Sequence, residues 1–164
     1  MVHKGKKTGS SEGLAMTGTI VRHRRAFRDY EILKRYEAGL VLFGSEIKSI
    51  RQHKIDLQGS YARIRSNEAW LVDTYIAPYE NAGYVTYDVR RERKLLLHKK
   101  EIKEIREALD ERRLTLVPLS LNIRRGRAKI ELGIARGLKN YDKRRKIQER
   151  EQNRQIARAL RHSI

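Results

Sequence analysis

The chain has 164 residues and no cysteine, which allows one domain with appendages and excludes disulfides, thiolate zinc sites and cysteine nucleophiles. Its formal net charge is +18, of which residues 1–28 contribute +6 and residues 136–164 contribute +7. This distribution favours a nucleic acid as partner, because phosphates attract Lys and Arg whatever the base sequence.

Residues 1–21 are rich in Gly and Ser and lack the apolar run of roughly 7–15 residues that a secretory signal needs. We predict a disordered leader here, with Met1 and Met16 as alternative starts. No stretch approaches the roughly 20 apolar residues of a membrane-spanning helix. We therefore expect a cytoplasmic location and no membrane partner.

The predicted folded domain covers residues 22–135. After a dense run of charge, residues 29–42 alternate as a strand does, and Gly39 within them predicts a bulge or a barrel corner. A short helix over about Glu46–Gln52 follows, with Ser45 as its expected N-cap. Residues 61–65 and 69–76 then alternate on either side of a short polar turn, which predicts a hairpin.

The long segment 77–93 interleaves tyrosines with arginines. This mixture suits RNA, because bases stack on aromatic rings while phosphates meet cations. The alternative is that the tyrosines pack as a lid on the domain and the arginines are only solvated. Both interpretations stay open at this point.

The spacing of Ile102, Ile105 and Leu109 predicts a helix from Leu95 to about Arg113. A last hairpin is predicted over residues 114–123 and 127–135, with Pro118 marking a kink, bulge or edge position. Antiparallel hairpins with inserted helices favour a mainly β fold, as a small closed or partly open antiparallel β-barrel.

Residues 136–164 form a basic tail that is too polar to fold by itself. Its apolar residues Ile156, Leu160 and Ile164 fall four apart, which would form a narrow stripe on a helix. We therefore predict a tail that is disordered when free and becomes helical on a polyanion.

The chain carries no motif that indicates an enzyme. Residues 5–9, Gly-Lys-Lys-Thr-Gly, lack the spacing of a phosphate-binding loop, and no G-x-S-x-G turn is present. The five histidines show no zinc-like spacing. We therefore expect a protein without catalysis, metal or cofactor.

Several blocks together resemble the SmpB family, the SsrA-binding proteins of bacterial trans-translation. They include GSEIKSIR (44–51), IAPYE (76–80), RERKLLLHKKEI (91–102), GRAKIE (126–131) and ARGLKNYDKR (135–144). The resemblance implies an oligonucleotide-binding-like barrel that binds the tRNA-like domain of transfer-messenger RNA. It also implies delivery of that RNA, with elongation factor Tu, to stalled ribosomes.

The resemblance also implies which residues act, although the chain departs from the family pattern at Phe27, Arg28 and Leu138. The expected RNA contacts are Arg24, Arg25, Tyr30, Glu37, Lys94, Leu96 and His98. The tail is expected to be helical on the ribosome, with Ile147 beginning a helix in the empty mRNA channel. The expected decoding-centre residues are Gly137, Tyr141, Asp142, Lys143 and Arg144.

Two of these residues have an alternative interpretation. Glu37 is either an ordinary strand acid or a carboxylate that orders an arginine or accepts a base N–H. Residues 95–97 are three leucines that a helix start would bury, whereas the resemblance makes Leu96 an exposed contact. The rival function is a general RNA chaperone or structural ribosomal protein without preference for a tRNA-like RNA.

Overall fold

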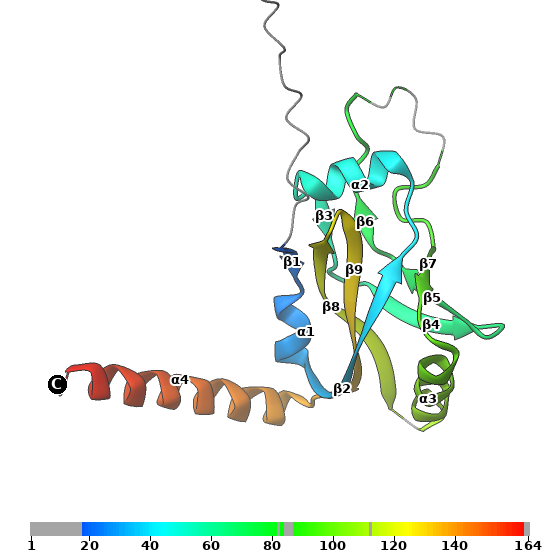
Figure 1. Cartoon of the computed structure of the whole chain (residues 1–164). Helices are drawn as coiled ribbons and strands as arrows, with labels where there is room; N and C mark the ends of the chain where they lie inside the picture. The colour runs from blue at the N-terminus through cyan, green and yellow to red at the C-terminus, as the bar shows by residue number, and fades with distance from the viewer. Residues whose placement is uncertain (1–17, 82, 84–86, 112, 163–164) are drawn as a thin grey trace, which may run out of the picture.

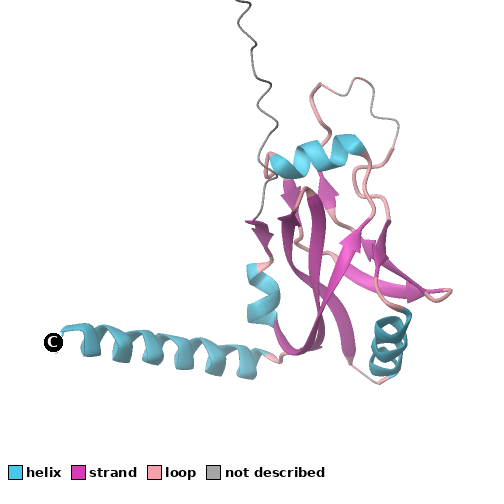
Figure 2. Ribbon diagram, in the orientation of Figure 1, coloured by secondary structure: helices cyan, strands magenta, loops and turns pink. Residues whose placement is uncertain are grey.

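The structure is a computed structural model, and it describes residues 18–81, 83, 87–111 and 113–162. Within them the fold is mainly β, with a seven-stranded antiparallel sheet, a two-stranded sheet and four helices (Figure 1, Figure 2). The strands are β1 Gly18–Arg22, β2 Tyr30–Leu40, β3 Ile55–Asp56, β4 Tyr61–Arg65, β5 Glu68–Val72, β6 Tyr75–Ile76, β7 Arg93–Leu96, β8 Leu114–Arg124 and β9 Arg127–Gly137. The helices are α1 Arg24–Asp29, α2 Gly44–Arg51, α3 Lys99–Asp110 and α4 Asn140–His162.

The large sheet runs in the order β1-β8-β4-β5-β7-β2-β9, and β9 also pairs with β8. Six strands therefore form a closed circuit of pairings, which runs from β8 through β4, β5, β7, β2 and β9 back to β8. β1 adds to β8 outside this circuit. β3 and β6 form the separate small sheet.

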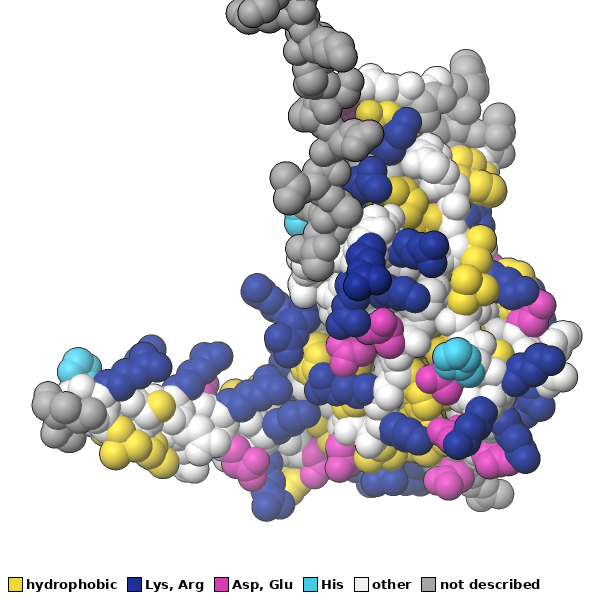
Figure 3. Space-filling view, viewed as in Figure 1, with side chains coloured by type: hydrophobic (Ala, Val, Ile, Leu, Met, Phe, Trp, Pro, Cys, Tyr) yellow, Lys and Arg dark blue, Asp and Glu magenta, His cyan; other side chains and the backbone are white. Residues whose placement is uncertain are grey.

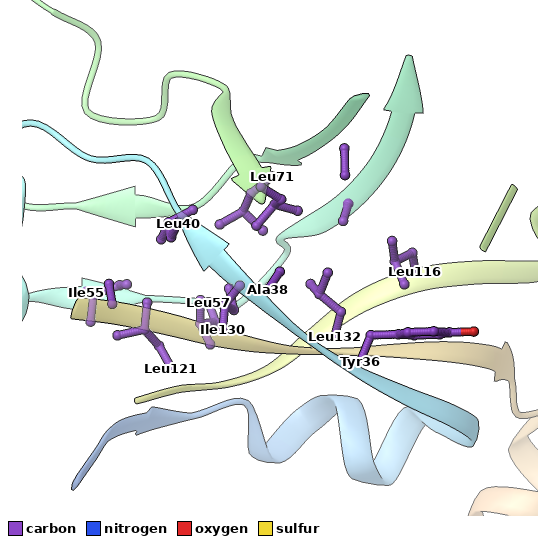
Figure 4. Close-up of a cluster of buried hydrophobic side chains, with 14 of the residues drawn as sticks. Tyr36, Ala38, Leu40, Ile55, Leu57, Leu71, Leu116, Leu121, Ile130 and Leu132 are labelled. Atoms are coloured by element: carbon purple, nitrogen blue, oxygen red, sulfur yellow. The ribbon is translucent and has the colours of Figure 1, made fainter. Parts of the chain in front are cut away.

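The core lies between the strands of this circuit. The predicted inward face of β9 is confirmed, because its residues Ala128, Ile130, Leu132 and Ile134 are all buried. They join side chains from β2 and β5, among them Ala38, Leu40 and Leu71 (Figure 4). Leu95 of β7 and Ile105 of α3 belong to the same cluster. Burial of apolar side chains on this scale is the main stabilising contribution to such a fold.

A second, smaller cluster lies on the other face of β8 and β9. Ala26 of α1 packs there on Val117, Leu119 and Ala135, all fully buried or nearly so. Phe27 lies against the same cluster. This packing holds α1 against the sheet, beside the point where the tail leaves it.

The domain boundaries differ from the sequence prediction. Residues 18–21 were placed in the disordered leader, but they form most of β1, whose partner is β8. The helix α1 was not predicted at all. At the other end β9 continues to Gly137, because its last residue pairs with Tyr30. The tail residues 140–162 form the helix α4, which projects from the body (Figure 1).

The strand β7 was missed, and the predicted helix from Leu95 was too long at both ends. Residues 93–96 pair with both β5 and β2, so the helix begins only at Lys99. Leucines favour a helix locally, but the pairing on two sides satisfies their backbone and buries Leu95. The backbone N–H of His98 donates to Glu101 at 2.9 Å and fixes the new helix start.

Three local predictions have different outcomes. The register shift in β2 lies between Ile32 and Lys34, so no bulge lies at Gly39, where the strand pairs with both β7 and β9. The shift in β8 falls directly after Pro118, as predicted. The N-cap of α2 is Phe43, whose N–H donates to Glu46 at 2.9 Å, and not Ser45.

The hairpin at residues 61–76 is confirmed in its first part only. β4 and β5 pair from Tyr61–Val72 to Arg65–Glu68, but the chain then turns and residues 75–76 join β3 in the small sheet. Among the described residues, no helix has the length and apolar character needed to cross a membrane.

Candidate nucleic-acid interface

The predicted RNA contacts fall into two groups on the surface of the body. The first group lies on α1 and at the start of β2. Arg24 and Arg25 are exposed in the first turn of α1, and Tyr30 is half-buried where β2 begins. Arg25 and Tyr30 line a pocket of about 450 Å³ together with Ser60 and Tyr61.

The second group lies where β2, β7 and α3 meet. Leu96 ends β7 with 55% of its surface exposed, whereas its neighbour Leu95 is buried. The exposed leucine that the resemblance implied is therefore Leu96. Lys94 donates to Glu68 at 2.9 Å, and His98 is exposed before α3.

Glu37 belongs to the second group and points away from the core on β2. Its Oε2 lies 3.4 Å from Nη1 of Arg124, and this ion pair favours the interpretation in which Glu37 orders an arginine. Both side chains remain more than two-fifths exposed. Such a pair is weak and can be exchanged for contacts with a ligand.

Gly39 explains how Leu96 comes to lie over the sheet. The two residues are partners across β2 and β7, and a Cβ at position 39 would lie only 3.2 Å from the Cβ of Leu96. The glycine therefore leaves space that the leucine side chain occupies. The sequence pattern suggested a bend at this glycine, whereas its role is to admit the neighbouring side chain.

We predict that Gly39→Ala weakens RNA binding about threefold to tenfold, because the new methyl group displaces Leu96. The midpoint of thermal unfolding should shift little, since Leu96 is free to move outward into solvent. Gly44→Ala is the matched control, because a Cβ there meets nothing within 4 Å. Equal binding by both variants, measured by fluorescence anisotropy, would remove this role from Gly39.

A buried ion network holds β7 in place behind the second group. Arg93 is fully buried, and its Nη2 and Nε donate to Oε1 of Glu46 at 2.7 and 2.9 Å. Arg91 Nη2 donates to the other carboxylate oxygen at 2.7 Å, and Arg93 Nη1 donates to the carbonyl of Thr74. The network ties α2 to the strand that carries Lys94.

The pKa of Glu46 reflects this surrounding. Burial opposes its ionisation, but hydrogen bonds from Arg91, from the backbone N–H of Phe43 and from Arg93 outweigh burial. The pKa of Glu46 is therefore lowered below its ordinary value, and the carboxylate is charged at neutral pH.

The segment 77–93 supports the lid interpretation where it is described; Tyr84 lies outside the described residues. The hydroxyl of Tyr87 lies 2.7 Å from that of Ser45, and its ring packs 5.0 Å from that of Phe43. Arg91 lies over the Phe43 ring, and Arg93 is enclosed. The tyrosine and arginines that looked suited to RNA are therefore engaged within the protein.

The outer faces of β2, β8 and β9 lie between the two groups and carry charges of both signs. Arg35 forms an ion pair with Glu131 at 3.1 Å, and Ser120 donates to the same carboxylate. Figure 3 shows Lys and Arg side chains scattered over the body and continuing onto α4. An excess of basic over acidic side chains on a surface is the electrostatic feature expected of a protein that binds nucleic acid.

The tail helix is attached to the body at its first turns. The N–H of Leu138 donates to the carbonyl of Asp29 at 2.9 Å, and Lys143 lies 3.5 Å from the carboxylate of the same residue. Lys146 donates to the carbonyls of Phe27 and Tyr30 at 2.9 and 3.2 Å. Desolvation on this contact lowers the pKa of Lys146.

The other predicted tail residues do not join this attachment. Gly137 ends β9 in an exposed position, and Tyr141 is 76% exposed. Ile147, Asp142 and Arg144 are also exposed, and no residue of α4 is buried. The predicted apolar stripe is unpacked at Ile156 and Leu160; Ile164 lies outside the described residues.

The sequence pattern missed the cationic face by which α4 contacts α1. Lys143, Lys146, Arg150 and Arg154 follow one another at intervals of three, four and four, so they share one face of the helix. This spacing of basic residues is the sequence signal for the contact, and Lys146 is the member of the series that donates to α1 and β2.

Comparison with known proteins gives the family. The family model described as SmpB protein matches residues 20–162. The chain belongs to the SmpB protein family. Because the match spans most of the chain and ends at residue 162, SmpB membership includes α4 as well as the sheet.

Similar SmpB family members confirm this over most of their length. An SsrA-binding protein of Roseiflexus castenholzii is 50% identical over 151 residues, which are 92% of this chain and 96% of that protein. The SsrA-binding protein of Limosilactobacillus reuteri strain DSM 20016 is 47% identical over 87% of this chain and 91% of its own.

A solved chain described as "tmRNA-SmpB: a journey to the center of the bacterial ribosome" matches with a TM-score of 0.63. It is 50% identical in sequence, and the match covers 73% of this chain and 85% of that one. The similarity thus extends from the sequence to the arrangement of the strands.

Proposed function

We propose that this protein is a transfer-messenger RNA-binding adaptor of trans-translation that catalyses no reaction. It binds the tRNA-like domain of that RNA and delivers it, with elongation factor Tu, to stalled ribosomes in the cytoplasm. The nascent peptide is then tagged and the ribosome is released. The observation that carries the proposal is the identity of 47–50% to SsrA-binding proteins over nearly the whole of both chains.

The body supplies the RNA-binding surface in this proposal. We infer that the closed circuit of six strands is an oligonucleotide-binding-like barrel. Arg24, Arg25 and Tyr30 contact the RNA from one side, and the second group, with Leu96 at its centre, contacts it from the other. The two groups lie near opposite ends of β2, which supports an extended rather than a point-like contact.

In this proposal the tail recognises a stalled ribosome by occupying its decoding centre and empty mRNA channel. Gly137, Tyr141, Asp142, Lys143 and Arg144 lie at the decoding centre, and the helix from Ile147 lies in the empty mRNA channel. Complete exposure of α4 beyond its first turns supports this, because the helix lacks an apolar face packed on the body. A cationic helix of this kind gains its stabilisation from surrounding phosphates and is disordered in the free protein.

Competition binding at fixed salt tests the proposal. A labelled tRNA-like-domain transcript is displaced from the full chain by unlabelled transcript or by an unrelated RNA of the same length. We expect the tRNA-like RNA to compete at least about tenfold better, because specific contacts add to the charge attraction that both RNAs share. Equal competition would point instead to a general RNA chaperone or structural ribosomal protein.

Leu96→Asp should weaken binding of the tRNA-like transcript by about tenfold or more, since it places a negative charge where phosphates approach. Glu37→Ala should weaken it by a smaller factor, because it releases Arg124 from its orientation. Leu160→Asp is the matched control, as Leu160 is also an exposed leucine, at 64%, and lies on α4 away from both groups. Unchanged affinity of both site variants would show that the second group does not contact RNA.

A further inference from the structure

A basic cleft of about 580 Å³ lies between α1 and the tail helix. Figure 1 shows α4 leaving the body beside α1. Its walls come from two segments more than a hundred residues apart in the sequence. Arg22, Arg24 and Phe27 form the body side. Arg150, Asn153 and Arg154 form the side provided by α4.

The charge of the cleft is unbalanced. Among the residues that the structure describes, four guanidinium groups and no carboxylate line it. Within the part of the chain that the structure describes, none of these four arginines forms an ion pair. Arg22 instead lies over the ring of Phe27, with 4.6 Å between the guanidinium carbon and the ring centroid. Like charges held together in this way repel unless an anion lies between them.

The chemistry of the lining selects the class of anion. Guanidinium groups bind phosphate through paired N–H donors, and a lining of several such groups suits a chain of phosphates more than a single ion. Arg24 of the cleft belongs to the first RNA-contact group, together with its neighbour Arg25 in α1. The cleft is thus continuous with a surface that RNA already covers in the proposed function.

We infer that the cleft between α1 and α4 binds phosphates of an RNA backbone and so fixes the direction of the tail. This inference rests on the proposed RNA-binding function and adds a site to it. α4 is also attached at its first turns, through Lys143 and Lys146. An RNA phosphate in the cleft adds a further attachment one to two turns along the helix.

RNA binding in the cleft and docking of α4 beside α1 favour each other by thermodynamic linkage. The site exists only when α4 lies beside α1, so RNA that occupies it favours that arrangement of the tail. The docked tail raises the affinity for RNA by the same factor. The protein would therefore present its tail in one direction when RNA is bound and in many directions when it is not.

The test compares two double charge reversals in the full chain. Arg150→Glu with Arg154→Glu changes the cleft, whereas Arg158→Glu with Arg161→Glu changes the same helix beyond it by the same net charge. We expect the cleft variant to bind the tRNA-like-domain transcript at least about tenfold more weakly, and the control less than about threefold. A plot of log affinity against log salt concentration should have a negative slope, and its magnitude should be smaller by about two for the cleft variant.

A distance measurement reports the tail directly. The chain has no cysteine, so Gln52→Cys and Gln155→Cys, both at exposed positions, accept spin labels without background. RNA should narrow the distribution of distances between the two spin labels in the labelled chain without charge reversals and in the Arg158→Glu, Arg161→Glu control. It should not narrow that distribution in the cleft variant. Far-ultraviolet circular dichroism and thermal unfolding verify that each variant is folded.

The outcomes separate the alternatives. If narrowing occurs with the transcript, the phosphates belong to the tRNA-like RNA; if it occurs only with isolated small ribosomal subunits, they belong to ribosomal RNA. Identical behaviour of the two double variants with both RNAs would overturn the inference. Loss of preference for the tRNA-like transcript by the unaltered chain would instead overturn the proposed function.

Discussion

A chain that ends at Lys139 should still prefer the tRNA-like RNA but should fail to support peptide tagging on stalled ribosomes. The cut removes α4 alone. It leaves β9 complete to Gly137 and keeps the hydrogen bond from Leu138 to Asp29. Because no residue of α4 is buried, its removal uncovers no core. The body should therefore fold and retain both proposed RNA-contact groups.

The expected loss of RNA affinity is about tenfold, which is the contribution of the cleft between α1 and α4. The expected loss of tagging is complete, because the proposed contacts with the decoding centre and mRNA channel all lie beyond or beside the cut. A reconstituted translation reaction on an mRNA without a stop codon measures tagging. Competition binding on the same preparation measures RNA preference.

A chain of natural length in which residues 140–162 alternate Gly and Ser is the control for the truncation. It should behave as the truncated chain does, since it has neither the charge nor the helix. Tagging by either chain at the rate of the natural protein would show that the tail is dispensable. Loss of RNA preference in both chains would show that the tail and not the body recognises the RNA.

Glu46→Gln should reduce the free energy of unfolding by about 3–5 kcal/mol, because it leaves the buried guanidinium of Arg93 without its counter-charge. The loss is larger than for a surface pair, since both partners are at most 1% exposed. Arg91 also loses its carboxylate partner. Chemical denaturation followed by the fluorescence of Trp70 measures the change.

The same network predicts how stability depends on pH. The pKa of Glu46 is lower in the folded protein than in the unfolded chain, so the folded state favours the ionised form. Its contribution is therefore complete above the ordinary carboxyl pKa of 4.5 and is lost as the pH falls through the lower folded value. The unfolding free energy should decrease below about pH 4.5 in the natural protein and less steeply in Glu46→Gln.

Glu80→Gln is the control for Glu46→Gln. Glu80 also pairs with a cation, Lys54, and its pKa is also lowered, but its side chain is 80% exposed. Solvent screens such a pair, so the substitution should leave the denaturation midpoint unchanged within error. If Glu46→Gln were no more destabilising than this control, the buried network would not be what holds α2 to β7.

Local sequence patterns correctly predicted those features that depend only on the residues of the element itself. Alternation in β9 placed Ala128, Ile130, Leu132 and Ile134 on the inward face, and the structure buries all four. Pro118 marked an irregularity because proline lacks the N–H that a ladder needs. Charge distribution indicated a nucleic acid, and the blocks of residues indicated the family that the comparisons then showed.

Only the tertiary structure decided features that depend on distant partners. β7 was read as the start of a helix because its leucines favour one locally, whereas pairing with β5 and β2 makes it a strand. The sequence pattern made Arg93 a candidate for RNA binding, whereas in the fold it is buried and paired with Glu46 of α2. The cleft between α1 and α4 needs residues 22–27 and 150–154 side by side. Sequence determines which charges a chain carries, but folding decides which of them pair inside the protein and which remain for a ligand.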